Sequence, residues 1–349
     1  MTICYFGIYN KNYSRNKILI SGLRKNGVKV IECNSRRPSL LKYFDLIFQY
    51  WKIRKQFNLI VVGFPGQTIV LLAKLISRKK IIFDAFLSVY DSYVFDRKTT
   101  PPKSLKAKYY WFLDWLSCKL ADKVLLDTNE HIKYFSETFG LKREKFSCIF
   151  IGADDAIFYP REIKKDIVQF LIHFHGTYIP LQGIKYIIEA ANILRGKSIV
   201  FHLIGSGQEY KDIKKKIVSL KLQNMVKLID FIPIKEVSRY IAKSDICLGI
   251  FGDTNKAKRV IPNKLYECIA MKKPVITADT IAIREIFKDG EELALCSIAN
   301  AKSLANKILE LKNNIELRKK LANKGYNLYK EKFCPKVLGL ELKNILKII

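Results

Sequence analysis

The sequence has no cysteine pair of the Cys-x-x-Cys type, although it contains eight cysteines in 349 residues. Half of them fall in apolar, strand-like runs: Cys4, Cys148, Cys247 and Cys296. Buried thiols of this kind are typical of a reducing compartment, and their scatter argues against a disulfide framework or a zinc site. The four histidines also lack metal spacing, so we expect structural or supporting roles for His173, His175 and His202.

Long hydrophobic runs are missing too. The most apolar region, residues 59–76, is interrupted by two glycines, a proline, a glutamine and a lysine, so it does not predict a membrane-spanning helix. Residues 1–15 lack the basic and then apolar pattern of a signal peptide. With no low-complexity run and no short repeat, we expect a soluble or peripheral protein in the cytoplasm.

Acidic residues are scarce, at 32 against 62 lysines and arginines, which leaves a formal net charge of +30. The excess is concentrated at the start, where residues 1–108 hold 21 basic and 5 acidic side chains. Such a field favours anionic partners, whether nucleic acid, acidic lipid or phosphate-bearing substrates. Charge alone does not choose between them.

Short apolar runs alternate with longer amphipathic stretches, which predicts an α/β protein built on parallel sheets. The length fits two domains, with a boundary near 153–166. In the first half we expect strands at 3–9, 28–33, 59–62, 80–83, 123–126 and 146–151, and helices near 15–26, 40–57, 67–77, 104–121 and 129–139. In the second we expect strands at 168–174, 199–204, 226–229, 246–250, 275–277 and 293–296, and helices near 183–195, 208–220, 235–243, 263–271, 281–287 and 300–311. Two tail helices meet at Pro335.

The segment 258–279 is the most informative. A turn at Pro262-Asn263-Lys264 leads into a short helix that carries Glu267. A helix N-terminus attracts phosphate, Lys264 adds a full positive charge, and Glu267 is placed to accept two ribose hydroxyls. A cation for a diphosphate and a carboxylate for a ribose predict a nucleotide-sugar site.

This pattern resembles the donor-binding motif of family 4 glycosyltransferases, also called glycosyl transferases group 1. The resemblance implies the GT-B fold, two Rossmann-like domains with an inter-domain cleft. Residues 1–160 would bind the acceptor, with a terminal helix at 333–349 packing back on them, and 161–332 would bind the donor. The implied activity is transfer of a sugar from a nucleotide diphosphate sugar to a hydroxyl, with retention of configuration, without a metal or other cofactor.

A second motif opens the donor domain, where a strand ends at His175 and a loop runs from Gly176 to Gly183. It resembles the family's Gly-Arg-x4-Lys-Gly loop, but Thr177 replaces the arginine and Gln182 replaces the lysine. An ordinary strand–helix connection is the plain alternative. If the loop binds the diphosphate, Lys264 must supply the charge, with Arg259 or Lys258 as support. The family's Glu-x7-Glu motif is half present, because Arg259 takes the place of the first carboxylate.

Weaker signals follow two other strands. Gly205-Ser206-Gly207 is a turn that borders the donor in the family, and Phe231 and Ile232 stand where the backbone reads the nucleobase. Both segments also suit a plain tight turn and core packing.

Carboxylates follow the fourth strand of the first domain. Relatives often place a histidine or aspartate here near the transferred sugar, so the resemblance implies that Asp84 and Asp91 lie in a loop near that sugar. We count them with Lys264 as catalytic candidates. Turn-capping or pairing with Arg97 is the structural alternative. The loop after the first strand replaces the glycine-rich loop of many relatives, and we expect it to meet the donor phosphates or the acceptor through Arg15.

Two basic and aromatic helical segments, 36–57 and 103–120, contain all three tryptophans. Interleaved basic and aromatic side chains suit an anionic membrane surface, although packing on the sheet explains an apolar face equally well. We expect a peripheral enzyme at the inner face of the cell membrane that extends a lipid-linked or cell-surface glycan or glycolipid in polysaccharide biosynthesis.

Three other functions remain open. A nucleic-acid-binding protein would explain the charge, but no such motif is present and no nucleic acid is expected. An NAD-dependent enzyme would use Gly205-Ser206-Gly207, which lacks the third glycine of the fingerprint. A catalytically silent sugar-nucleotide-binding relative would fit the loss of the first carboxylate at Arg259.

Overall fold

A computed structural model describes residues 1–165 and 168–348, and the chain forms two compact units. Unit 1 comprises Met1–Gly152 with Phe333–Ile349, and unit 2 comprises Ala153–Lys332. Residue 166, in the charged segment expected at the boundary, lies outside the described residues, as does Ile349 at the end of the expected terminal helix.

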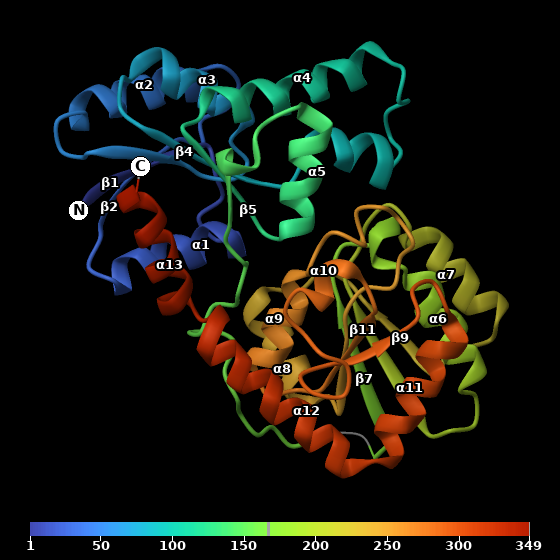
Figure 1. Ribbon diagram of the computed structural model, residues 1–349. Coiled ribbons are helices and arrows are strands. Elements are labelled where there is room, and N and C mark those ends of the chain that lie inside the picture. The colour runs from blue at the N-terminus through green and yellow to red at the C-terminus, as the bar shows by residue number, and fades with distance from the viewer. Residues whose placement is uncertain (166–167, 349) are drawn as a thin grey trace. The chain divides into compact units, whose positions relative to one another are not determined.

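Unit 1 is built on a six-stranded parallel sheet with the strand order β2-β1-β3-β4-β5-β6 (Figure 1). Ile3 on β1, the second strand from the edge, is in register with Val30 on one side and Leu59 on the other. The strands are β1 (Thr2–Gly7), β2 (Lys29–Asn34), β3 (Leu59–Val62), β4 (Ile81–Phe86), β5 (Lys123–Leu126) and β6 (Phe146–Cys148). Runs such as Leu59–Val62 are buried throughout, as expected for strands covered on both faces.

Helices cover both faces of this sheet. They are α1 (Ser14–Lys25), α2 (Leu41–Ile53), α3 (Gln67–Ile76), α4 (Leu105–Leu120), α5 (Asn129–Phe139) and α13 (Pro335–Ile348). One core cluster joins the sheet to α2, α3, α4 and α5, and a second joins the opposite face to α1 and α13. Leu338 and Leu342, on the apolar stripe of α13, are buried in the cluster that contains α1. The last helix therefore packs on the first sheet.

The fourth strand is longer than the sequence predicts. Strand β4 continues through Asp84 to Phe86, and the loop expected to start there begins later. It is followed by a π-helical segment, Asp91–Asp96, which the hydrophobic pattern does not predict. A second π-helical segment, Tyr329–Phe333, joins α12 (Ile315–Leu328) to α13 just before Pro335.

Unit 2 repeats this architecture with the strand order β12-β11-β10-β7-β8-β9, again all parallel. The strands are β7 (Phe170–His175), β8 (Ile199–Ile204), β9 (Val226–Ile229), β10 (Ile246–Leu248), β11 (Val275–Ala278) and β12 (Ala294–Cys296). The expected start at Val168 is wrong, because that side chain is 98% exposed and β7 begins at Phe170.

The helices of unit 2 are α6 (Ile184–Ile193), α7 (Tyr210–Ser219), α8 (Ile234–Lys243), α9 (Asn263–Ala270), α10 (Ile281–Arg284), α11 (Ala301–Asn313) and α12. Its main core joins β7, β8 and β10 to α6 and α11, with residues such as Phe201 and Leu304 fully buried. Two parallel sheets with helices on their faces confirm the predicted α/β fold class. Among the described residues, no helix is long and apolar enough to span a membrane.

Candidate functional site: the β7–β10 switch point of unit 2

The strand order of unit 2 reverses direction between β7 and β10. From β7 the chain moves to β8 and β9 on one side, whereas β10, β11 and β12 lie on the other. The loops that leave the carboxyl ends of β7 and β10 therefore diverge, and such a point is where parallel α/β sheets bind ligands. The loop after β7 carries Gly176 and Gln182, and the segment after β10 leads to α9, which carries Lys264 and Glu267.

These two loops are in direct contact. The amide of Phe251 donates to the carbonyl of Gln182 at 3.0 Å, and the amide of Gly252 donates to Leu181 at 3.2 Å. Gly183 has a φ of 65°, and a Cβ there would lie 2.3 Å from the Gly252 nitrogen. Glycine is therefore required at this turn both for its backbone conformation and for the close approach of the second loop.

Lys264 lies in the first turn of α9 with only 4% of its surface exposed. Its Nζ donates to Oε1 of Gln182 and stands 3.7 Å from the centroid of the Phe174 ring. A Cβ on Gly176 would approach this Nζ to 3.0 Å, so the glycine leaves room beside the amine. Burial lowers the pKa of Lys264 well below its ordinary value. The residue that replaces the family's loop lysine, Gln182, thus orients the lysine of α9.

Glu267, one turn further along α9, is also buried and contacts His175, which in turn contacts His173. Its Oε2 lies 2.7 Å from Nε2 of His175, whose Nδ1 lies 2.8 Å from Nε2 of His173. Burial and the neighbouring His175 lower the pKa of His173 well below its usual range, which keeps that ring neutral. One set of tautomers, with His173 donating from Nε2 to His175 and His175 donating from Nε2 to the carboxylate, gives each of the two contacts one donor and one acceptor, and it leaves the buried Nδ1 of His173 without a partner.

The turn after β8 lies against the loop after β7. A Cβ at Gly205, where φ is 133°, would come within 2.0 Å of the Gly176 carbonyl oxygen. The Ser206 carbonyl accepts from the amide of Tyr178 at 2.9 Å, and Ser206 and Gly207 are exposed. The structure therefore brings the predicted glycines of both loops to one edge of the sheet, with Thr177 exposed between them.

The remaining donor-site candidates follow two other strands of this sheet, β10 and β9. Pro262 is buried just before α9, Asn263 is its first residue, and Arg259 is partly buried in the preceding segment. Phe231 and Ile232 follow β9, which β8 separates from β7. Phe231 is 84% exposed, so the core-packing alternative is wrong for this residue.

Asp84 does not lie in an open loop as expected. It is inside β4, fully buried, and its carboxylate accepts from Nε of Arg15 at 3.0 Å and from Nη2 at 2.8 Å. Arg15 is equally buried and also donates to the carbonyl of Phe150 at 3.1 Å. The expectations that Asp84 faces a ligand and that Arg15 meets phosphates are therefore corrected, because the two charges neutralise each other within the core of unit 1.

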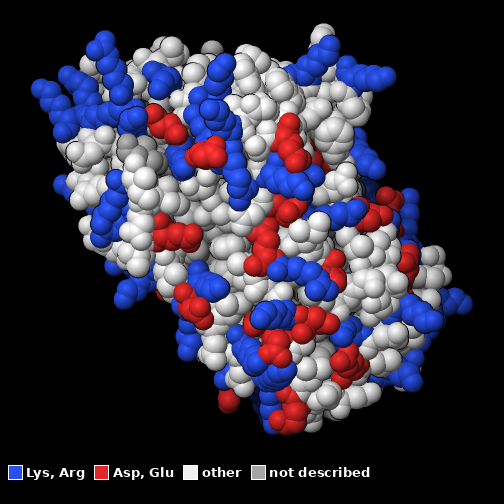
Figure 2. All heavy atoms as spheres, viewed as in Figure 1, with Lys and Arg blue, Asp and Glu red and all other residues white. Residues whose placement is uncertain are grey.

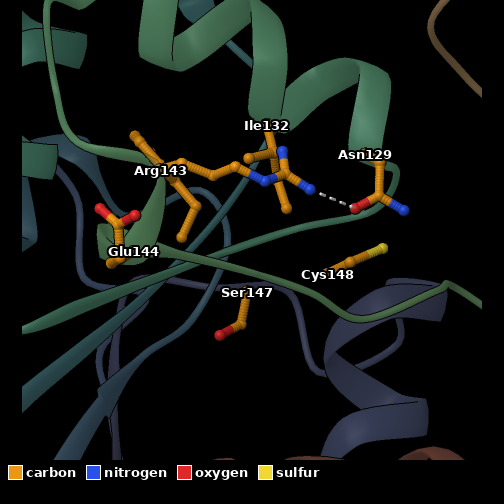
Figure 3. A pocket seen from close by; sticks show the side chains of 7 residues that line it. Asn129, Ile132, Arg143, Glu144, Ser147 and Cys148 are labelled. Atoms are coloured by element: carbon orange, nitrogen blue, oxygen red, sulfur yellow. Dashed lines mark hydrogen bonds between the residues drawn. The ribbon is translucent and has the colours of Figure 1, made fainter.

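Asp91 begins the π-helical segment and is 2% exposed. Its amide donates to Oγ of Ser88 at 2.9 Å, so the residue takes part in the turn after β4. A pocket of about 310 Å³ elsewhere in unit 1 lies between α5 and β6 (Figure 3). There Arg143 donates to Oδ1 of Asn129 at 3.1 Å, and none of the predicted site residues lines it.

Sequence reasoning missed the contacts that hold these groups. It gave His173 and His175 supporting roles without a partner, and it treated Gln182 as the loss of a family cation. The signal available was the position of His175 directly before Gly176 at the end of a strand. The contact with Glu267 bridges 92 positions and appears only in the folded chain.

Comparisons with known proteins agree with this geometry. Residues 157–328 match the family model for glycosyl transferases group 1. An uncharacterized glycosyltransferase of Methanocaldococcus jannaschii is 30% identical over 45% of this chain and 42% of its own. The amylovoran biosynthesis glycosyltransferase AmsK of Erwinia amylovora is 30% identical over 37% of this chain and 33% of its own. The chain therefore spans less than half the length of these curated relatives.

The fold is similar over the whole chain to a solved structure. The HepE protein of Anabaena, crystallised in complex with UDP, superposes with a TM-score of 0.76 at 14% identity, covering 100% of both chains. Crystals of that protein also contain UDP-glucose. The chain has the two-domain GT-B fold, and its residues 157–328 are similar to the glycosyl transferases group 1 family.

Proposed function

We propose that this protein is a retaining family 4 glycosyltransferase, which transfers a sugar from a nucleotide diphosphate sugar to an acceptor hydroxyl. The observation that carries the proposal is the pair on α9. Lys264 and Glu267 lie three positions apart on α9, at the switch point, beside the glycine loop that starts at Gly176. A diphosphate on the amine and a ribose on the carboxylate would place the sugar beyond the carboxyl edge of the sheet.

The chemistry assigned to these groups is mainly electrostatic. The amide groups at the start of α9 and the amine of Lys264 would neutralise the charge that develops on the departing diphosphate. Because the lysine is already held by Gln182, little reorganisation would be needed when the donor binds. In a retaining mechanism the diphosphate leaves and the acceptor attacks on the same face of the sugar. The departing phosphate then accepts the acceptor's proton, so no dedicated protein base is assigned.

Other predicted residues take positioning roles in this proposal. Gly205, Ser206 and Gly207 would border the donor, and the backbone at the exposed Phe231 and the partly buried Ile232 would meet the nucleobase. Asp91 remains a candidate for contact with the transferred sugar. No metal or other cofactor is assigned, and full activity in the presence of EDTA would test this.

The acceptor is proposed from the relatives. Enzymes named for amylovoran biosynthesis and colanic acid biosynthesis are among the proteins that this chain resembles. We infer a lipid-linked or cell-surface glycan as the acceptor and the cytoplasmic side of the membrane as the place of reaction.

A thermal-shift panel tests the donor site. UDP, GDP and ADP and their sugars are added to wild type, to Glu267→Ala and to Glu316→Ala, a matched control on the exposed face of α12. A ligand at about 100 times its Kd stabilises the folded state by about 2.7 kcal/mol. We expect one nucleobase series to raise the Tm of wild type and of the control but not of Glu267→Ala. An equal shift in all three proteins contradicts the assignment.

Turnover separates an enzyme from a silent relative. The stabilising donor is incubated with lipid-linked glycan acceptors, and the release of nucleoside diphosphate is measured. The anomeric configuration of the product, read by NMR, tests retention. Binding of the donor without any transfer or hydrolysis would favour the catalytically silent alternative.

A further inference from the structure

Three neighbouring helices of unit 1 carry large apolar side chains on their outer faces. The helices α2, α3 and α4 pack on the same core cluster of the first sheet (Figure 1). Contacts between α3 and α4, and a hydrogen bond of 3.5 Å from Tyr43 to Thr68 between α2 and α3, show that they are neighbours. The exposed apolar residues are Leu41, Phe44, Phe48 and Trp51 on α2, Leu71 and Leu75 on α3, and Leu105, Tyr109 and Phe112 on α4.

These residues are not the core-facing stripe of their helices. On α2, Leu46 and Tyr50 are buried against the sheet, whereas Phe44 is 68% and Phe48 61% exposed. The exposed positions 41, 44, 48 and 51 recur at helical spacing, so they form a second apolar stripe on the opposite side. Packing on the sheet, the alternative for this segment, therefore explains the buried face of α2 but not its exposed apolar face.

Basic side chains surround the apolar stripes. Residues 36–57, 67–80 and 103–120 contain fourteen lysines and arginines but only two acidic residues, Asp45 and Asp114. Asp114 is buried and accepts from Oγ of Ser88 at 2.7 Å, so it contributes little negative charge at the surface. Lysine and arginine side chains gather at the upper left of Figure 2, over α2.

Cations on α2 and directly after it are also in contact with the rings of this helix. Nζ of Lys52 lies 4.1 Å from the centroid of the Phe48 ring, and the Arg54 guanidinium lies 4.5 Å from that of Trp51. In these pairs the charged group lies over the face of an exposed ring, so cations and apolar rings share one surface, as on helices that lie in a membrane interface.

We propose that the outer faces of α2, α3 and α4 form a membrane-binding surface that inserts Phe44, Phe48 and Trp51 into the headgroup region of an anionic bilayer. The combination of the two features carries the choice of partner. Transfer of exposed leucine and phenylalanine side chains from water into an apolar medium is favourable. The surrounding cations are attracted by acidic lipids. The phosphates of a nucleic acid would satisfy the cations but would leave Leu71, Leu75 and Leu105 in contact with polar groups. This inference does not depend on sugar transfer.

Vesicle sedimentation tests the proposal. The full chain is mixed with vesicles of pure phosphatidylcholine, or of equal parts phosphatidylcholine and phosphatidylglycerol, at low salt and at about 1 M salt, where the Debye length is about 3 Å. We expect binding to the anionic vesicles that weakens with salt, and a blue shift of the tryptophan emission as Trp51 leaves water.

Matched variants separate the two contributions. The triple variant Phe44→Ser/Phe48→Ser/Trp51→Ser should have a vesicle partition coefficient about tenfold or more below that of wild type. In Lys52→Gln/Arg54→Gln the partition coefficient onto anionic vesicles should fall about fivefold for each charge removed, and the remaining binding should depend less on salt. The control Ile193→Ser/Val218→Ser removes two exposed apolar side chains from helices of unit 2 and should bind like wild type. Circular dichroism of each variant confirms that it is folded.

Several results would overturn the proposal. These are the absence of binding to anionic vesicles, equal binding to both compositions, or undiminished binding of the triple variant. Self-association that the triple variant abolishes, without vesicle binding, would assign the surface to a second copy of the chain. A gel shift of duplex or single-stranded DNA with the same variant dependence would assign it to nucleic acid.

Discussion

The Nε2 atom of His175, the last residue of β7, lies 2.7 Å from Oε2 of Glu267 on α9. This hydrogen bond ties the helix that carries the proposed ribose ligand to the central strand of the sheet. Because His173 supports His175 in turn, the carboxylate is oriented before any ligand arrives. The chain of two histidines and one glutamate therefore links the stability of unit 2 to its proposed affinity for nucleotides.

Replacing His175 with leucine should affect both properties. The buried carboxylate of Glu267 would lose its partner, and an unsatisfied buried polar group costs about 1–3 kcal/mol. We expect the free energy of unfolding in urea to fall by that amount and the Kd for the preferred nucleoside diphosphate, measured by calorimetry, to rise. The control His202→Gln, on the neighbouring strand β8, should keep wild-type affinity. Unchanged nucleotide affinity in His175→Leu would show that this contact does not position Glu267 for binding.

Acid sensitivity should follow from His173. Its pKa is lowered well below 6.5 by burial, so below about pH 6.5 the unfolded chain takes up a proton that the folded chain does not. The free energy of unfolding must therefore decrease as the pH falls, by at most about 1.4 kcal/mol per pH unit from this group. In His173→Gln, which retains a donor, we expect a shallower decrease between pH 7 and pH 5. Parallel curves for the two proteins would argue against a neutral buried ring.

Nucleotide binding should be coupled to proton uptake at Lys264. Burial lowers the pKa of this amine in the free protein, and a bound diphosphate would raise it again. Affinity should therefore decrease as the pH rises above the pKa of the free protein. Calorimetry at pH 8 in buffers of different ionisation enthalpy measures the protons taken up. We expect uptake in wild type and much less in Lys264→Met; equal uptake would place the proton on another group.

Lys264 should also make the free energy of unfolding depend on pH. Between its lowered pKa and about 10.4 the unfolded state binds more protons than the folded state, so the free energy of unfolding rises with pH. Lys264→Met should show a smaller rise over that range in urea titrations. If Lys264→Met follows the wild-type curve, the pKa of Lys264 is not lowered in the folded protein, and the prediction is contradicted.

Separating Arg15 from Asp84 should destabilise unit 1. Removing one partner of a buried ion pair costs about 3–5 kcal/mol, because the other charge stays in the core unpaired. We expect losses of this size for Arg15→Met and for Asp84→Leu, with recovery of a substantial part in the double variant. Strictly additive losses in the double-mutant cycle would mean that the pair has no coupling energy.

The strands were the most predictable part of the fold. Leu59–Val62, Lys123–Leu126, Ile199–Ile204 and Val226–Ile229 coincide with the expected ranges, because each is an apolar run between polar or turn residues. The end of β4 was not predictable in the same way. An aspartate looks like the end of a buried strand unless its counter-ion is known, and Arg15 lies 69 positions away.

The candidate site shows the same division. The turn and helix at Pro262 to Glu267 and the glycine at 183 follow from local rules for helix starts and left-handed turns. What local rules omit is the set of partners: Gln182 for Lys264 and His175 for Glu267. The first contact joins the loop after β7 to α9, and the second joins the end of β7 itself to α9. Both depend on the order of strands in the sheet, which the pattern along the chain does not encode.

A crystal structure with the stabilising nucleoside diphosphate sugar tests the central claim most directly. We predict a diphosphate oxygen within about 3 Å of Nζ of Lys264 and the ribose hydroxyls on the carboxylate of Glu267. A nucleotide bound away from α9, with both side chains in their free positions, would contradict the account.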